Sequence, residues 1–232
     1  MATYNGTKTL TKQVQSILKQ LTFEDELIVI DDCSQDATLT LIQTLTADFV
    51  GQVIIKQNAI NSGPIKSFEK ALALATGDII MLSDQDDEWY ADKVERVCTE
   101  FKVNNADLVV HDAVVIGRQG EQIDGSWNHY NHNDVHQNIL GNFIKNGYTG
   151  AMMATSRRLL DVALPFPNEI EMHDQWLFLV AKKKRFKIVI IEEPLMAYVR
   201  HGGNVTGMVK RSKQEMLIGR YKMFNNYLRL RR

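Results

Sequence analysis

The stretch DIIMLSDQDDEW, residues 78–89, decides the fold. Residues 78–82 have the length and apolar character of a buried β-strand, and four acidic residues follow before Trp89. The apolar run 27–30 has the same design, because Asp31 and Asp32 follow it directly. In an open α/β sheet, ligands collect beyond the carboxyl ends of the strands. Both acidic stretches are therefore candidate parts of a binding site.

The surrounding sequence alternates between strand-like and helix-like segments. Short apolar strands are predicted at 27–30, 52–56 and 78–82, and helical periodicity is predicted at 8–21, 39–45 and 64–75. This rhythm is typical of a mainly parallel sheet covered by helices on both faces. The second half is less regular: we predict strands at 108–116, 187–191 and 195–199, a polar loop at 117–133, a helix near 174–184, a glycine-rich loop at 201–207 and a basic helix at the end.

Composition excludes several classes of protein. The chain has 232 residues and a formal net charge of −1, so nothing indicates a nucleic-acid partner. Cys33 and Cys98 are too few for a disulfide scaffold or a zinc cluster. No apolar run approaches the roughly 20 residues that cross a bilayer, and residues 1–6 do not resemble a signal peptide. We therefore expect a cytoplasmic location.

The spacing of the acids after residue 82 predicts a metal site. Residues two apart in an extended chain point to the same side, so Asp84 and Asp86 can converge. Carboxylates this close repel each other unless a cation lies between them. Mg²⁺ or Mn²⁺ fits such a site and leaves coordination positions open for phosphate oxygens. The alternative is that these acids only cap helices and form turns.

Five motifs, in order, make the chain resemble the family 2 glycosyltransferases, which are inverting enzymes with the GT-A fold. The closest resemblance is to their bacterial rhamnosyl- and glucosyltransferase branch. The motifs are Ala2-Thr3-Tyr4-Asn5-Gly6, Ile30-Asp31-Asp32-Cys33-Ser34-Gln35-Asp36, Asn61-Ser62-Gly63 with Lys66, Ser83-Asp84-Gln85-Asp86-Asp87-Glu88-Trp89 and His173-Asp174-Gln175-Trp176.

The resemblance implies a role for each motif. Asp84 and Asp86, the family's DxD motif, would hold the cation against the donor diphosphate, and Asp174 would be the general base. The nucleotide would be bound by Thr3, Asn5, Asp31, Asp32, Asn61, Lys66 and Asp84. His201 resembles a residue that reaches the metal in parts of the family; the alternative is a surface histidine.

Trp89, His173 and Trp176 are candidates for the acceptor and sugar pocket. The tryptophans could equally pack in the core, and His173 could instead orient Asp174 or cap its helix.

The implied protein is one GT-A domain over 1–232, with a nucleotide-sugar-binding half (1–115), an acceptor-binding half (116–207) and a basic C-terminal helix (208–232). Relatives begin with an apolar strand just before the first motif, so we expect that central strand to be truncated here. The implied donor is a UDP- or dTDP-linked sugar, and the implied acceptor is a saccharide or lipid-linked saccharide.

The last segment carries many cations and an apolar stripe. The cations are Lys210, Arg211, Lys213, Arg220, Lys222, Arg229, Arg231 and Arg232. This pattern fits a helix packed on the domain with a solvated basic face, or a helix resting on the anionic inner membrane surface.

Two other classes of function stay open at this level. A non-catalytic nucleotide-sugar-binding module would be compatible with a truncated first strand. A magnesium-dependent phosphotransfer domain also places paired acids at strand ends, but it is too short to include both 83–89 and 173–176.

Overall fold

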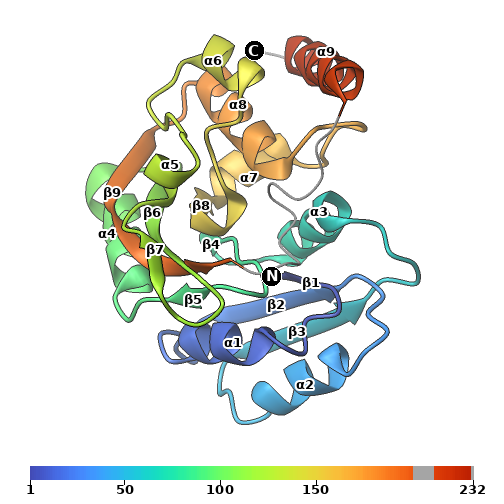
Figure 1. The fold of residues 1–232 in the computed structure, drawn as a ribbon, viewed down its shortest axis with the longest axis vertical. Helices are drawn as coiled ribbons and strands as arrows, with labels where there is room; N and C mark the ends of the chain where they lie inside the picture. Colours follow the sequence, from blue (N-terminus) through green and yellow to red (C-terminus); the bar gives the residue numbers. More distant parts are fainter. Residues whose placement is uncertain (201–211, 231–232) are drawn as a thin grey trace.

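The structure is a computed structural model and describes residues 1–200 and 212–230. It contains two β-sheets with helices packed on them (Figure 1). The strands are β1 (Ala2–Thr3), β2 (Glu26–Asp31), β3 (Gln52–Gln57), β4 (Ile79–Met81), β5 (Glu88–Trp89), β6 (Leu108–Ile116), β7 (Gln122–Asp124), β8 (Met153–Ser156) and β9 (Ile188–Val199). The helices are α1 (Leu10–Leu18), α2 (Thr38–Leu45), α3 (Pro64–Leu74), α4 (Lys93–Asn104), α5 (Trp127–Tyr130), α6 (Ile139–Ile144), the 3₁₀ turn η1 (Gly150–Met152), α7 (Arg157–Ala163), α8 (His173–Lys184) and α9 (Lys213–Arg229).

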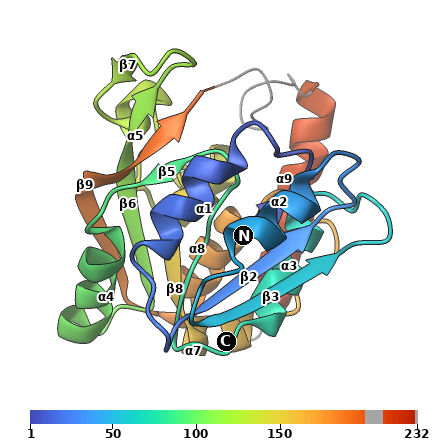
Figure 2. The same cartoon turned by 90° about the horizontal axis from the view of Figure 1, so that it is seen from below.

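The first sheet is parallel and has the order β1-β2-β3. Successive residues of β2 pack on opposite faces, as the strand period requires. Leu27 and Val29 belong to the core formed with α1 and α2, while Ile28 and Ile30 pack with Ala71 of α3. In Figure 2, α1 and α2 lie on the near side of these strands. The sequence prediction of a parallel sheet covered on both faces describes this sheet well.

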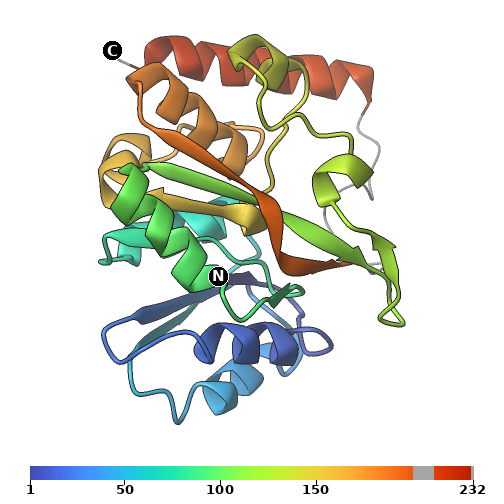
Figure 3. The ribbon, with the colours of Figure 1, turned by 90° about the vertical axis from the view of Figure 1, so that its left-hand side faces the viewer.

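The second sheet is mixed and has the order β4-β8-β6-β9-β5, with β7 paired to β6. Only the β6–β9 pair is parallel among its described strands, so the prediction of parallel strands does not extend to it. Val97 and Phe101 of α4 pack on one face, and the residues of α7 and α8 fill the core on the other. Figure 3 shows the sheet between these helices.

Several elements differ from the sequence prediction. The segments 187–191 and 195–199 form the single strand β9, whose register against β6 shifts where Asp112 faces Pro194. Proline has no N–H to donate to the ladder, which fits the register shift at this position. The predicted loop 117–133 contains β7 and α5, and the elements α4, α6, α7 and β8 were not predicted.

The first and last described elements are β1 and α9. β1 has two residues and pairs with β2, and no pairing between β1 and β4 joins the two sheets within the described residues. A capping box between Ser212 and Glu215 begins α9, and Met223 of this helix is fully buried in the core. Within residues 1–200 and 212–230, no helix has both the length and the apolarity to cross a bilayer.

Candidate active site

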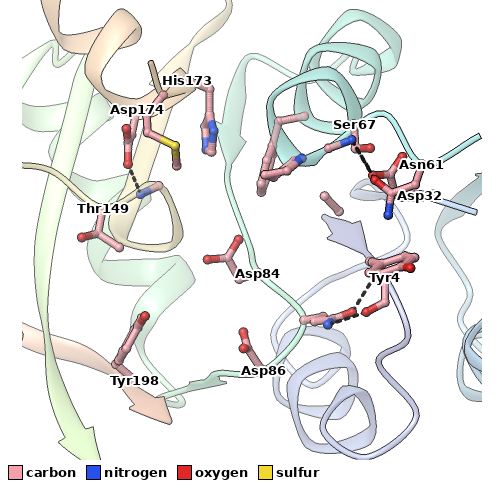
Figure 4. A pocket seen from close by; sticks show the side chains of 18 residues that line it. Tyr4, Asp32, Asn61, Ser67, Asp84, Asp86, Thr149, His173, Asp174 and Tyr198 are labelled. Atoms are coloured by element: carbon pink, nitrogen blue, oxygen red, sulfur yellow. Dashed lines mark hydrogen bonds between the residues drawn. The ribbon is translucent and has the colours of Figure 1, made fainter. Parts of the chain in front are cut away.

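One cavity brings together residues from both halves of the chain. It lies at the carboxyl ends of β2 and β4, where the sequence predicted a binding site. In Figure 4, Asp84 and Asp86 lie between two groups of side chains. One group comes from the first half and includes Tyr4, Asp32, Asn61 and Ser67, and the other comes from the second half and includes Thr149, His173, Asp174 and Tyr198.

Asp32 organises the first-half wall of the cavity. Its Oδ1 accepts hydrogen bonds from Asn58 Nδ2 (2.7 Å) and the Ser62 N–H (2.8 Å), and its Oδ2 accepts one from the Gly63 N–H (2.7 Å). Burial alone would raise the pKa of Asp32, but these hydrogen bonds lower it below its usual value. Asp32 is therefore an anion that fixes the loop 58–63, and Oδ2 keeps a lone pair for a further donor.

Tyr4 and Asn61 lie beside Asp32 in this wall. The Tyr4 side chain is 45% exposed, and Asn61 Oδ1 accepts a hydrogen bond from the Gly63 N–H (3.2 Å). Gln85 holds Tyr4 in place: its Oε1 accepts from the Tyr4 N–H (2.9 Å) and its Nε2 donates to the Tyr4 carbonyl (3.0 Å). An exposed aromatic ring beside a carboxylate can stack on a nucleobase while the acid reads its edge.

Only some of the other predicted nucleotide-binding residues line the cavity. Thr3 lines the cavity and donates to Asp31 Oδ1 (3.1 Å). Asp31 itself is fully buried and accepts hydrogen bonds from Ser34 and Gln57, so it does not reach the cavity. Asn5 and Lys66, also predicted to bind the nucleotide, do not line the cavity. Asn5 Oδ1 accepts from the Gln35 N–H, and Lys66 pairs with Glu69 (2.6 Å) along an exposed side of α3.

The acidic loop after β4 offers a metal site. Each of Asp84, Asp86 and Asp87 presents an oxygen within 4.8 Å of the others. Burial raises the pKa of Asp84 to about 7, and the charges of Asp86 and Asp174 act in the same direction. Burial and the charges of Asp86 and Asp84 also raise the pKa of Asp87, whose Oδ2 is buried without a hydrogen-bond partner among the described residues.

Three repelling carboxylates with an unsatisfied buried oxygen fit a hard divalent cation, since a cation would satisfy that oxygen and remove the repulsion. Asp84 and Asp86 were predicted as ligands, and Asp87 is added by its position in the cluster. His201 lies outside the described residues.

Asp174 lies across the cavity from Asp32, in the first turn of α8. Its Oδ1 accepts from Asn146 Nδ2 (2.9 Å) and the Gln175 N–H (2.6 Å), and its Oδ2 accepts from the Gly150 N–H (3.1 Å). Burial raises the pKa of Asp174 to about 6, in opposition to these hydrogen bonds. A carboxylate with this pKa is mainly ionised at neutral pH and can take up a proton there.

His173 lies beside Asp174 and also faces the cavity. Its ring stacks on Phe68 of α3 with 4.2 Å between centroids, and neither ring nitrogen has a hydrogen-bond partner among the described residues. Burial lowers the pKa of His173 to about 3, so the ring is neutral. A neutral imidazole offers one donor and one acceptor to a polar ligand such as a sugar.

Trp89 and Trp176 do not line the cavity, and their burial favours the alternative of core packing. Trp89 is 7% exposed and packs in the core between the two sheets. Trp176 is 2% exposed and donates from Nε1 to the Ala163 carbonyl (3.0 Å). The aromatic side chains of the cavity are Tyr4, Phe68 and Tyr198 instead. Of these, Tyr4 belongs to the first motif, and no sequence pattern marks Tyr198.

The fold and this site define a glycosyltransferase. The family model "Glycosyl transferase family 2" matches residues 1–163, and the chain belongs to that family. Asp174 follows the matched segment. The family excludes the phosphotransfer domain.

Individual relatives and solved structures agree with this assignment. The chain is 24% identical to the dTDP-rhamnosyl transferase RfbG of Shigella flexneri over 89% of its own length and 73% of that protein. It also spans 38% and 34% of two other curated relatives. TarS of S. aureus in complex with UDP-GlcNAc has a TM-score of 0.75 at 20% identity, over 99% of this chain and 65% of that one.

The mannosyltransferase PcManGT of Pyrobaculum calidifontis, in complex with GDP-Man and Mn²⁺, has a TM-score of 0.61 at 18% identity, over 97% and 61% of the two chains. These solved neighbours confirm the GT-A fold.

Proposed function

We propose that this chain is an inverting glycosyltransferase that moves a sugar from a UDP- or dTDP-linked donor to a hydroxyl group of a saccharide or lipid-linked saccharide, in bacterial cell-surface polysaccharide synthesis. One observation carries the proposal: Asp84 and Asp86 lie between the Asp32 wall and Asp174 in a single cavity. A donor diphosphate at the acidic loop would have its nucleoside on one side and the acceptor on the other. RfbG is a dTDP-rhamnosyl transferase and TarS was solved with UDP-GlcNAc, and both relatives support the choice of donor.

Each wall of the cavity has a distinct chemical task. Tyr4, Asp32 and Asn61 bind the nucleoside, and Asp84 with Asp86 and Asp87 hold Mg²⁺ or Mn²⁺ against the diphosphate. The bound ion supplies Lewis-acid stabilisation of the departing diphosphate. Asp174 accepts the proton of the acceptor hydroxyl as its oxygen attacks the anomeric carbon from the face opposite the leaving group. Because this is a single in-line displacement, the anomeric configuration inverts without a covalent enzyme intermediate.

Release of nucleoside diphosphate from a panel of UDP-, dTDP-, GDP- and CDP-sugars with Mn²⁺ tests this function. Saccharide acceptors are added to the reaction, and the anomeric configuration of the product is read by NMR. A β-linked product from an α-linked donor supports inversion. A product that retains the donor configuration, or no release from any donor, would contradict the proposal.

The nucleobase preference is a separate prediction. Asp32 Oδ2 can accept from the imide N–H of uracil or thymine, whereas cytosine presents an acceptor at that position and purines are larger. UDP and dTDP should therefore bind more tightly than CDP or GDP by about 1–3 kcal/mol, measured by calorimetry with Mn²⁺. The Lys66→Met variant should bind like the wild type, because that side chain pairs with Glu69 outside the cavity. Equal affinities for UDP and GDP would refute this reading of Asp32.

We also propose that α9 contacts an anionic membrane surface, where lipid-linked acceptors would lie. Leu217, Tyr221, Phe224 and Leu228 form a stripe on α9 with exposures between 42% and 67%. Ile144 of the neighbouring α6 is 67% exposed beside them. The described cations of α9 are Arg220, Lys222 and Arg229; the remaining predicted ones lie outside the described residues, or in the case of Lys213 have no described side chain. Apolar side chains flanked by cations suit the surface of an anionic bilayer.

Sedimentation with vesicles of phosphatidylglycerol and phosphatidylcholine tests this contact. The wild type should bind at low salt, and the triple variant Leu217→Ser, Tyr221→Ser, Leu228→Ser should bind at least about tenfold more weakly. The matched control is Phe23→Ser, Val50→Ser, Ile60→Ser, which removes three apolar side chains of somewhat greater exposure from the first half of the chain. Equal loss in both variants, or no binding by the wild type, would exclude α9 as the membrane contact.

A further inference from the structure

Lys93 is a buried lysine that the proposed reaction does not use. It is the first residue of α4 and only 2% exposed. Its Nζ donates to the Ala151 carbonyl (3.0 Å), lies 3.5 Å from Met196 Sδ and sits 4.1 Å from the centroid of the Trp89 ring. A buried charge is costly unless nearby groups stabilise it. Such a side chain in the core therefore calls for a specific explanation.

The groups around Lys93 come from the acidic loop and from the second-half wall of the site. Asp87 and Asp84 of the loop raise the pKa of Lys93, while burial, the larger effect, lowers it to about 7. Trp89 of β5 and Met196 of β9 provide the remaining surroundings, and His111 of β6 is neutral because burial lowers its pKa far below the usual value. The single described carbonyl that accepts from Nζ belongs to the turn η1.

The turn η1 touches the proposed base directly. Gly150, its first residue, donates from its N–H to Asp174 Oδ2 (3.1 Å), and Ala151 is the next residue. Trp127 Nε1 holds the preceding residue, Thr149, through its hydroxyl (2.8 Å). Lys93 thus fixes the turn from one side and Trp127 from the other. The N–H that contacts Asp174 lies one residue from the carbonyl that Lys93 holds.

We propose that Lys93 is a positioning residue that fastens η1 to α4 and so keeps the Gly150 N–H on the Asp174 carboxylate. This inference rests on the proposed role of Asp174 as the base. A hydrogen bond to the ionised form of a carboxyl group favours ionisation. When the turn is released, Asp174 should therefore hold its proton to higher pH. The charged or titratable neighbours that also face Asp174 are Asp84 and the neutral His173.

The test compares Lys93→Met with Lys102→Met, which removes an exposed lysine from the same helix. Hydrogen–deuterium exchange of a peptide covering 149–152 should become on the order of tenfold faster in Lys93→Met and stay unchanged in Lys102→Met. In Lys93→Met, the pH at which kcat/KM for sugar transfer begins to fall on the acid side should rise by about one unit. If Lys93→Met does not fold, Lys93→Gln, which keeps a donor without the charge, is measured in the same way.

The two readouts separate this inference from the proposed function. A wild type that transfers no sugar refutes the proposed function, and the exchange of 149–152 still decides whether Lys93 holds the turn. An active enzyme whose Lys93→Met variant is folded and keeps its acid limb overturns the inference. Exchange that rises uniformly across the chain together with a lower Tm also overturns it, because that is the result of a purely structural lysine.

Discussion

The Asp174→Asn variant should lose about 10²–10⁴-fold in kcat for sugar transfer, the usual contribution of a general base. The amide oxygen of asparagine can still accept from the Gly150 N–H, so the turn should stay in place, but the side chain can no longer take up the acceptor proton. The affinity for the nucleoside diphosphate should stay within about twofold, since Asp174 lies across the cavity from Asp32. Initial rates at saturating donor and acceptor, with calorimetry for nucleotide affinity, measure both quantities.

The pH profile provides the signature of this base. Burial raises the pKa of Asp174 to about 6, and only the ionised form can accept a proton. The wild-type rate should therefore fall as the pH drops through about 6 and level off above it, whereas the residual rate of Asp174→Asn should lack that limb. Asp92→Asn makes the same chemical change at an exposed acid and should behave like the wild type. An Asp174→Asn enzyme with more than about a tenth of the wild-type rate would remove Asp174 from the mechanism.

The parts of the site that the sequence predicted share one local geometry. Asp32 follows β2 directly, and Asp84 and Asp86 lie in the short loop after β4, so their place at the edge of a sheet depends mainly on the preceding strand. Asp174 was assigned from the His173–Trp176 motif, and its position in the first turn of α8 brings it to the same cavity. Neither inference needs knowledge of how distant segments pack.

The residues that sequence reasoning missed or misplaced depend on such packing. Asn146 and Gly150 hold Asp174 from a turn about 25 residues upstream, and no periodicity marks either of them. Trp89 follows the acidic loop closely, yet in β5 its side chain points into the core and forms a face for Lys93. Asp31 and Asp32 are adjacent, so in a strand they point to opposite sides, and only Asp32 reaches the cavity.

Chelation, or the substitution Asp86→Ala, should reduce sugar transfer by roughly 10²–10³-fold, because the charge stabilisation that a bound cation supplies is worth several kcal/mol. The same substitution should leave the Tm of the metal-free protein equal or higher, since Asp86 raises the pKa of both Asp84 and Asp87 by repulsion. Lower activity with an equal or higher Tm therefore identifies the loss of a metal ligand, whereas a damaged fold would lower both activity and Tm. Mn²⁺ binding, followed by electron paramagnetic resonance, should weaken in parallel with activity.

Glu88→Gln is the matched control for this prediction. Glu88 follows the cluster directly and is exposed on β5, but it is not part of the group that converges within 4.8 Å. Its removal takes one negative charge from the same loop, so a general electrostatic effect of the loop would weaken Mn²⁺ binding in both variants. Specific coordination predicts a large effect in Asp86→Ala and a small one in Glu88→Gln. Full activity in excess chelator, together with an unimpaired Asp86→Ala enzyme, would show that the acidic loop acts without a metal ion.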